Sequence, residues 1–218
     1  MELLPLTPDD LLTTTRAVRR RLDLERPVER EVVDECLRIA LQAPNGSNRQ
    51  PWRWVVVDDP ATRAAMADIW RRAMAGYVAE LDEAREAGTL DTPPPAERQA
   101  EISQSVGHLS THLHDVPVLV VPTIDGRMED SGTYDQATRW GSVLPAVWSF
   151  MLALRARGLG SCWTTIHLHR EEEMAELLGI PYGEVTQAGM FPVAHTIGTE
   201  FRPGARAASA DVVHWNRW

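Results

Sequence analysis

The 218-residue chain is poor in cysteine and contains no long apolar run. Its two cysteines, Cys36 and Cys162, form no spaced motif and do not make a disulfide framework. No apolar run approaches the roughly 20 residues that a membrane-spanning helix needs. Residues 1–5 lack the basic and apolar regions of a secretory signal. We therefore expect a cytoplasmic protein with no membrane partner and no covalent role for the two thiols.

Positive charge is also scarce, because 22 basic residues face 31 acidic ones and the formal net charge is −9. A chain with this balance repels a phosphate backbone, which argues against nucleic acid as a general partner. The composition, 44% hydrophobic and 24% charged, is that of an ordinary globular protein. The length suits one buried core, so we expect a single domain over residues 1–218.

Hydrophobic periodicity and turn residues predict helices separated by short strands. The expected helices cover residues 8–14, 29–42, 60–88, 97–113, 142–157 and 170–178. The expected strands cover residues 52–57, 116–124, 161–166 and 187–198, with a loop at 126–132. Pro117 and Pro122 favour ends or an edge of their strand, because proline cannot donate to a ladder. Strands scattered among long helices predict an α+β fold with helices around a small sheet.

The C-terminus carries two large apolar side chains, Trp215 and Trp218, in its last four residues. Both would be left in water unless something covers them. A neighbouring subunit is the natural cover, so the tail predicts a homodimer.

Three polar clusters are candidates for binding. In the first, residues 15–21, Arg16 and Arg19 would converge on one phosphate if the segment is extended, since guanidinium donors pair with phosphate oxygens. A bare run of arginines is more often a solvated basic patch. The second, residues 43–52, is a glycine-containing loop whose amides and backbone groups suit the polar edge of a planar ring. Alone it also fits an ordinary loop of turn residues.

The third cluster joins residues 158–166 with the late arginines Arg202 and Arg206. A tight glycine turn into a strand lets backbone donors approach a ligand closely. A cation from the tail would complete a phosphate site, and the sequence does not choose between the two arginines.

Together these clusters resemble the nitroreductase family. Its members carry Arg-Arg-Ser-x-Arg near the start, then Ala-Pro-Ser-Gly-x-Asn-x-Gln-Pro-Trp before a valine-rich strand, a late Gly-Leu-Gly-Ser and an arginine near the end. This chain has Thr15-Arg-Ala-Val-Arg19, Ala43-Pro-Asn-Gly-Ser-Asn-Arg-Gln-Pro-Trp52, Gly158-Leu-Gly-Ser161 and Arg206. Each motif is weak alone, but four in the same order over nearly the whole chain are specific.

The resemblance implies a nitroreductase-like sandwich of helices around a small mixed, mainly antiparallel sheet, in an intertwined homodimer that holds FMN between subunits. Residues 60–140 would be a variable substrate lid and residues 199–218 a tail that wraps the partner. Hydride would pass from NAD(P)H to flavin N5, and then to a small electrophilic or aromatic acceptor such as a nitro compound, quinone or enone. One shared pocket implies ping-pong kinetics. No catalytic side chain is needed.

The resemblance also assigns site residues. Those implied to bind FMN are Arg16, Ala17, Arg19, Pro44, Asn45, Gly46, Asn48, Trp163, Thr164, Thr165 and Arg206. Ala17 and Asn45 stand where serines are usual. Thr15 replaces an arginine, for which Arg20 or Arg21 could compensate.

Candidates for the substrate pocket are Trp70, Met74, Tyr77, Tyr134 and Trp140. The first three recur at helical spacing, so they could instead fill a core stripe. No acceptor follows from them.

Other interpretations remain. His108 and His112 stand four apart, but the glutamate of the hydrolytic zinc motif is missing, so we expect no metal. We expect His167 and His169 to face solvent. The same scaffold could use oxygen for dehydrogenation or ring cleavage, or bind flavin without turnover. A basic nucleic-acid module would rest on residues 16–21 alone.

Overall fold

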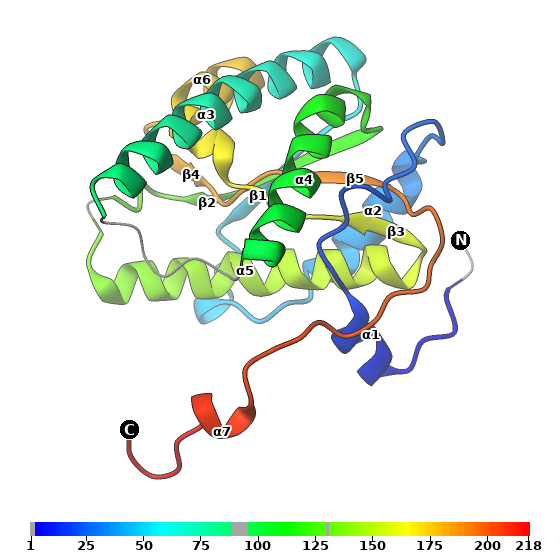
Figure 1. Cartoon of the computed structure of the whole chain (residues 1–218), viewed down its shortest axis with the longest axis vertical. Coiled ribbons are helices and arrows are strands. Elements are labelled where there is room, and N and C mark those ends of the chain that lie inside the picture. Colours follow the sequence, from blue (N-terminus) through cyan, green and yellow to red (C-terminus); the bar gives the residue numbers. More distant parts are fainter. Residues whose placement is uncertain (1–2, 89–95, 130) are drawn as a thin grey trace.

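The computed structural model describes residues 3–88, 96–129 and 131–218 (Figure 1). Its helices are α1 (Pro8–Thr14), α2 (Arg30–Ala40), α3 (Pro60–Glu86), α4 (Ala96–His112), α5 (Thr133–Ala156), α6 (Glu171–Leu178) and α7 (Ser209–Val212). Short 3-10 turns lie at Gly46–Asn48, Leu113–Asp115 and Ile166–Arg170. The strands are β1 (Trp52–Val57), β2 (Val118–Asp125), β3 (Leu159–Ser161), β4 (Val185–Gln187) and β5 (Phe191–His195).

The strands form one sheet in the order β1-β2-β5-β3, and β4 pairs with β2 beyond the end of β5. Every ladder between named strands is antiparallel, and an isolated parallel bridge joins Ala17 to Ser161. The predicted α+β class and small, mainly antiparallel sheet are therefore confirmed.

Helices cover both faces of this sheet, as the alternation of β2 requires. Val118 and Val120 point to a core shared with α2 and α5, whereas Leu119 and Val121 point to a core shared with α3 and α6. Figure 1 shows the same layers, with α5 along one face and α3 and α6 along the other. The predicted sandwich of helices is confirmed.

Two predicted strands are wrong in extent. The strand expected at 161–166 ends at Ser161, and the chain then turns into a 3-10 segment while Thr164 keeps only an isolated bridge to Met190. The strand expected at 187–198 is two strands, β4 and β5. Gly189 breaks it with φ +140°, and the indole of Trp163 packs where a side chain at 189 would stand.

The helix expected at 142–157 begins earlier, at Thr133. Its first turns are largely polar, so hydrophobic periodicity did not reveal them. Pro122 lies inside the central strand β2, not at an end or edge. Its carbonyl accepts a hydrogen bond from the backbone N–H of Ala188 at 2.8 Å, at the place where β4 gives way to β5. No ladder donor is required of Pro122 there, so the proline is tolerated.

The residues after β5 leave the body of the molecule as an extended tail that carries α7 (Figure 1). Trp215 is 84% exposed and Trp218 is fully exposed, as the sequence led us to expect of a single chain. Across the described part of the chain, no helix is both long enough and apolar enough to cross a bilayer.

Candidate active site

The arginine segment, residues 15–21, which was predicted to bind phosphate, lies against β3. Val18 donates its backbone N–H to the carbonyl of Ser161 at 2.8 Å, beside the Ala17 bridge. This approach depends on Gly160, because a Cβ there would lie 2.9 Å from Cβ of Val18 and 2.7 Å from Cγ2 of Thr196. The second glycine of the Gly-Leu-Gly-Ser motif thus lets the arginine segment reach the sheet edge.

Arg16 and Arg206 converge from opposite ends of the chain. A Cβ on Gly204 would lie 2.6 Å from Nη1 of Arg16 and 2.6 Å from Nη1 of Arg206. Arg16 also donates to the carbonyl of Arg202 at 3.0 Å. Among residues 3–88, 96–129 and 131–218, no carboxylate forms an ion pair with Arg16, Arg19 or Arg206. Adjacent guanidinium groups without an acidic partner suit an anion with several oxygens.

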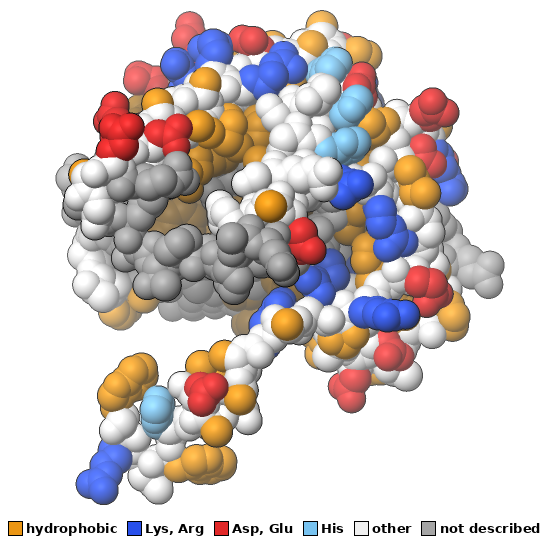
Figure 2. Space-filling view, viewed as in Figure 1, with side chains coloured by type: hydrophobic (Ala, Val, Ile, Leu, Met, Phe, Trp, Pro, Cys, Tyr) orange, Lys and Arg blue, Asp and Glu red, His pale blue; other side chains and the backbone are white. Residues whose placement is uncertain are grey.

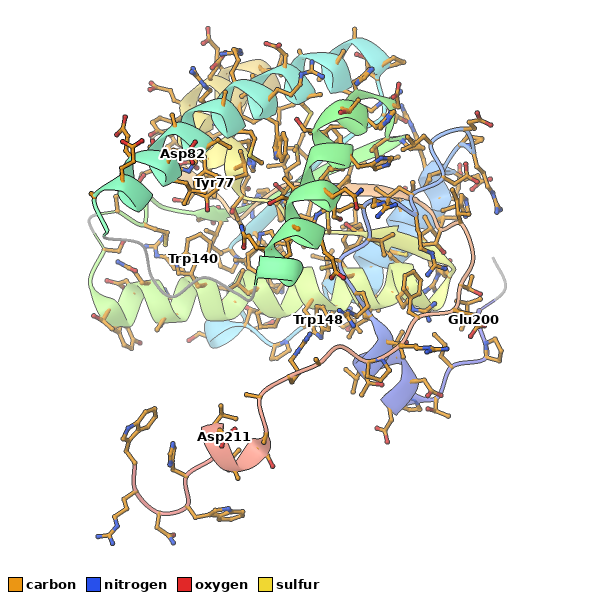
Figure 3. All side chains as sticks on the ribbon, viewed as in Figure 1. Tyr77, Asp82, Trp140, Trp148, Glu200 and Asp211 are labelled. Carbon is orange, nitrogen blue, oxygen red and sulfur yellow. The ribbon has the colours of Figure 1, made fainter. Side chains whose placement is uncertain are left out.

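Arg20 and Arg21, which could compensate for Thr15, form hydrogen bonds elsewhere in the chain. Arg21 donates through Nε, Nη2 and Nη1 to the carbonyls of residues 197, 198 and 200, at 2.8, 2.7 and 2.9 Å. Its guanidinium also lies 4.2 Å from the ring centroid of Phe201. Arg20 donates to Oε1 of Gln104 at 3.1 Å. Arg21 therefore anchors residues 197–201 at the start of the tail, the stretch in which Figure 3 labels Glu200.

The loop after β3 is held from several sides. Thr164 exchanges both backbone hydrogen bonds with Met190, and its Oγ1 accepts from Nε1 of Trp70 at 2.8 Å. Trp163 donates from its indole to the carbonyl of Ala188 at 2.9 Å, yet remains 43% exposed. The loop thus offers a fixed aromatic surface together with Thr165, which is exposed.

A cavity of about 480 Å³ opens beside this loop. Its wall brings Arg19, Trp163, Thr164 and Thr165 together with three predicted substrate residues of α3: Trp70, Met74 and Tyr77. Trp70 is almost fully buried and forms the base of the wall, whereas Met74 and Tyr77 are half-buried. Hydrophobic side chains gather in the hollow between α3 and α4 (Figure 2).

The α4 side of this cavity was not predicted from the sequence. Ile102, Val106 and Leu109 line it, at spacings of four and three that place them on one face of the helix. That periodicity was visible in the sequence. Nothing in it told which neighbour the face would meet.

The other two predicted substrate residues lie elsewhere. Tyr134 is exposed and lines a separate hollow with Gly46, Arg139 and Ser142. Trp140 is half-buried and packs against the core between the sheet and α5. Figure 3 shows Tyr77 on α3 and Trp140 on α5, on opposite sides of the space between the two helices.

The asparagine loop, residues 43–52, packs on α5, away from the arginine cluster formed by Arg16 and Arg206 (Figure 1). The N–H of Gly46 donates to Oγ of Ser142 at 3.0 Å, and Oδ1 of Asn45 accepts from the N–H of Gln50 at 2.9 Å. Pro44 and Asn48 are exposed. A single chain therefore does not bring this loop into the cavity that contains Arg19 and Trp163.

The prediction that His167 faces solvent is wrong, whereas His169 is exposed as expected. His167 is fully buried, and burial lowers its pKa to about 4. Burial raises the pKa of both Cys36 and Cys162 to about 11, so neither is a ready nucleophile. Within the described residues, no three or more metal-ligating side chains come together as a metal site, and His108 and His112 are therefore not part of one.

Comparison with known proteins agrees with this geometry. A family model described as "Nitroreductase family" matches residues 12–195. The chain is 32% identical over 145 residues to a 5,6-dimethylbenzimidazole synthase of Rhodospirillum rubrum, an alignment that covers 64% of this chain and only 61% of that protein. It is 26% identical over 211 residues to a nitrobenzene nitroreductase of Ectopseudomonas oleovorans, covering 86% and 87% of the two chains.

Among solved structures, the fold is similar to that of oxidized iodotyrosine deiodinase bound to FMN and 3-iodo-L-tyrosine. The TM-score is 0.71 at 20% identity, over 96% of this chain and 99% of that one. At such identity the likeness concerns the fold. The family match spans most of the chain and includes the arginine segment, the asparagine loop and the glycine turn. This chain belongs to the nitroreductase family of flavoprotein oxidoreductases.

Proposed function

We propose that the chain binds FMN and works as an NAD(P)H-dependent oxidoreductase that reduces a small electrophilic or aromatic acceptor. The observation that carries this proposal is the pair Arg16 and Arg206, whose guanidinium groups meet beside Gly204 without a carboxylate partner among the described residues. In a chain of net charge −9, such a cluster calls for an anionic ligand.

The residues present fit FMN. Arg16 and Arg206 would hold the phosphate, and Arg19, in the cavity wall, would lie towards its ribityl end. Ala17 offers no hydroxyl, so the phosphate would depend on the arginines and on backbone donors. The loop of Trp163, Thr164 and Thr165 would present its backbone groups to the ring.

Bound FMN would supply the redox chemistry by accepting hydride at N5 and passing it to the acceptor. The chain's own side chains would bind, orient and exclude water. The two buried thiols, with pKa values of about 11, take no part. One cavity would serve reductant and acceptor in turn, which supports ping-pong kinetics.

The site would be completed by a second copy of the chain. Pro44, Asn45, Gly46 and Asn48 lie away from the arginine cluster in one chain, so they would reach the flavin from the partner. Trp148 on α5 and the tail residues Trp215 and Trp218 are exposed and would be covered in a homodimer.

A second candidate is an oxygen-using flavin enzyme, because one relative, at 32% identity, is named a 5,6-dimethylbenzimidazole synthase and not a reductase. That alignment leaves over a third of the synthase unmatched, whereas the nitrobenzene nitroreductase is matched over most of its length. We therefore rank reduction first. Anaerobic bleaching of the flavin by NADH or NADPH, followed by reoxidation with a nitroaromatic, quinone or enone, would support it. Turnover only with oxygen would favour the second candidate.

Binding tests the phosphate site directly. The purified chain should be yellow and should bind FMN at least about tenfold more tightly than riboflavin, which lacks the phosphate. Arg16→Met and Arg206→Met should each reduce this preference, and Arg38→Met, an exposed change on α2, should leave it intact. If FMN and riboflavin bind equally, or if no flavin binds, the proposal fails. A convergent double-reciprocal pattern would contradict the shared pocket.

A further inference from the structure

The cavity between α3 and α4 has an unusual lining for so acidic a chain. Its wall is formed by residues from α3, α4, the loop after β3 and the arginine segment. At about 480 Å³, the cavity has the size of ordinary small-molecule pockets.

Formal charge is almost absent from this wall. Among the lining residues that the structure describes, Arg19 is the one charged side chain and none is an aspartate or glutamate, although the chain has 31 of these. Asp82 follows Leu81 on α3 but is exposed and lies outside the lining. A ligand with an ammonium group would therefore meet no counter-charge in the described part of the wall.

Arg19 does not leave a free anion site in the cavity under the proposed function. In the proposed complex Arg19 would lie towards the phosphate and ribityl end of FMN, because it belongs to the same segment as Arg16 and Ala17. The charge of Arg19 also acts on the buried thiol of Cys162, where it lowers a pKa that burial raises more strongly. What remains for a second ligand is a wall of apolar side chains and neutral hydroxyl or amide groups.

The wall also presents flat surfaces. Trp163 stacks on Phe191 with ring centroids 6.0 Å apart and remains 43% exposed. Tyr77 packs against the ring of His169, with centroids 5.7 Å apart. Both rings are supported from behind, so they form rigid surfaces against which a planar ligand can lie.

The mouth of the cavity is apolar too. Val78 on α3 is 46% exposed and Ile102 on α4 is 36% exposed, and both line the cavity. Apolar side chains at an exposed rim are what a ligand with an apolar body requires. A carboxylate that passed between them would lose hydration without gaining a partner.

We propose that the cavity between α3 and α4 selects a flat, uncharged aromatic acceptor and discriminates against carboxylate and zwitterionic analogues, with Val78 and Ile102 as specificity-determining residues. That the ligand is reduced as an acceptor rests on the proposed function. The selection itself follows from the charge and shape of the wall.

The test pairs ligands that differ in charge. With the FMN-loaded protein, kcat/KM for nitrobenzene should exceed that for 4-nitrobenzoate by at least about tenfold, because the carboxylate must be desolvated. Isothermal titration calorimetry with benzyl alcohol and benzoate, which are not reduced, should show the same order of affinity. The calorimetric readout does not depend on turnover, so it separates failure of the cavity from failure of the flavin chemistry.

Variants locate the selection. Val78→Lys and Ile102→Lys each place a cation at the mouth and should shrink the preference for the neutral ligand several-fold. Ala79→Lys is the matched control, because Ala79 is exposed on the same helix and does not line the cavity. It should leave the preference unchanged. Equal binding of benzyl alcohol and benzoate by the unmodified protein, or an equal effect of all three lysines, would overturn the inference.

Discussion

Nε1 of Trp70 donates a hydrogen bond to Oγ1 of Thr164 over 2.8 Å, with both side chains buried. The bond joins the middle of α3 to the loop after β3, far along the chain. Trp70 was predicted as a wall of the substrate pocket. The structure makes it also the support of the loop whose backbone would face the flavin ring.

Trp70→Phe should destabilise the fold by about 1–2 kcal/mol, because it removes a buried donor and leaves Oγ1 of Thr164 unpaired. Thr164→Val should cost a similar amount by orphaning the indole N–H. In urea titrations the double variant should cost less than the sum of the two, since the partners are lost together. Strict additivity would mean that the hydrogen bond contributes nothing.

Gly160→Ala should cost about 1–3 kcal/mol, since its Cβ would press on Val18 and Thr196 and displace the arginine segment from β3. FMN affinity should fall with it. Gly76→Ala on α3 is the control, because nothing lies within 4 Å of a Cβ at that position. That change should be neutral or stabilise α3 by about 0.5–1 kcal/mol. Two variants with the same melting temperature would refute the close approach at Gly160.

His167 should make the fold sensitive to acid. Its pKa is about 4 in the folded chain because of burial, and about 6.5 when unfolded. Below pH 6.5 the unfolded chain takes up a proton that the folded chain does not. The free energy of unfolding therefore decreases as the pH is lowered from 6.5 to about 4. Between pH 7.5 and pH 5, this one group should remove about 2 kcal/mol.

Chemical denaturation of the unmodified chain and of His167→Asn at both pH values measures this loss. The variant should lose less stability on acidification, whatever its stability at pH 7.5. His114→Gln, an exposed change, serves as the control. Parallel pH profiles for the unmodified chain and His167→Asn would contradict the buried, neutral imidazole.

Arg21→Lys should loosen the root of the tail, because lysine cannot donate to three carbonyls while stacking on Phe201. Trypsin cleavage after Arg206, which is followed by Ala207, should become several-fold faster, with little change at sites in the body. Arg20→Lys, next to it in sequence, replaces an arginine with a single described hydrogen bond and should change cleavage little. Unchanged cleavage in both variants would show that Arg21 does not hold the tail.

Sequence patterns predicted the elements best where hydrophobic periodicity and a strong stop signal coincide. The helix expected at 60–88 is α3, Pro60–Glu86, because proline begins it and its apolar stripe faces one core. The strand expected at 187–198 is divided at Gly189, and a single glycine did not reveal this division without the indole that packs there. Polarity likewise misled at His167, which lies in the core.

The candidate site was predicted in part for a related reason. Motif resemblance located the arginine segment and the loop after β3, which do lie together around one cavity with Met74 and Tyr77. It did not place Tyr134 and Trp140, because α5 carries them to a different hollow and to a core. Nor did it identify Ile102, because helical spacing alone does not tell which neighbour a helix face meets.

The backbone of the asparagine loop limits which residues can replace those found there. Ser47, Asn48 and Gln50 all have φ near +50°, a conformation in which β-branched side chains clash with their own backbone. Homologues that keep this loop are therefore restricted there to small or flexible residues, with glycine the least strained replacement. Valine, isoleucine or threonine at any of the three would mark a lineage in which the loop has taken another shape.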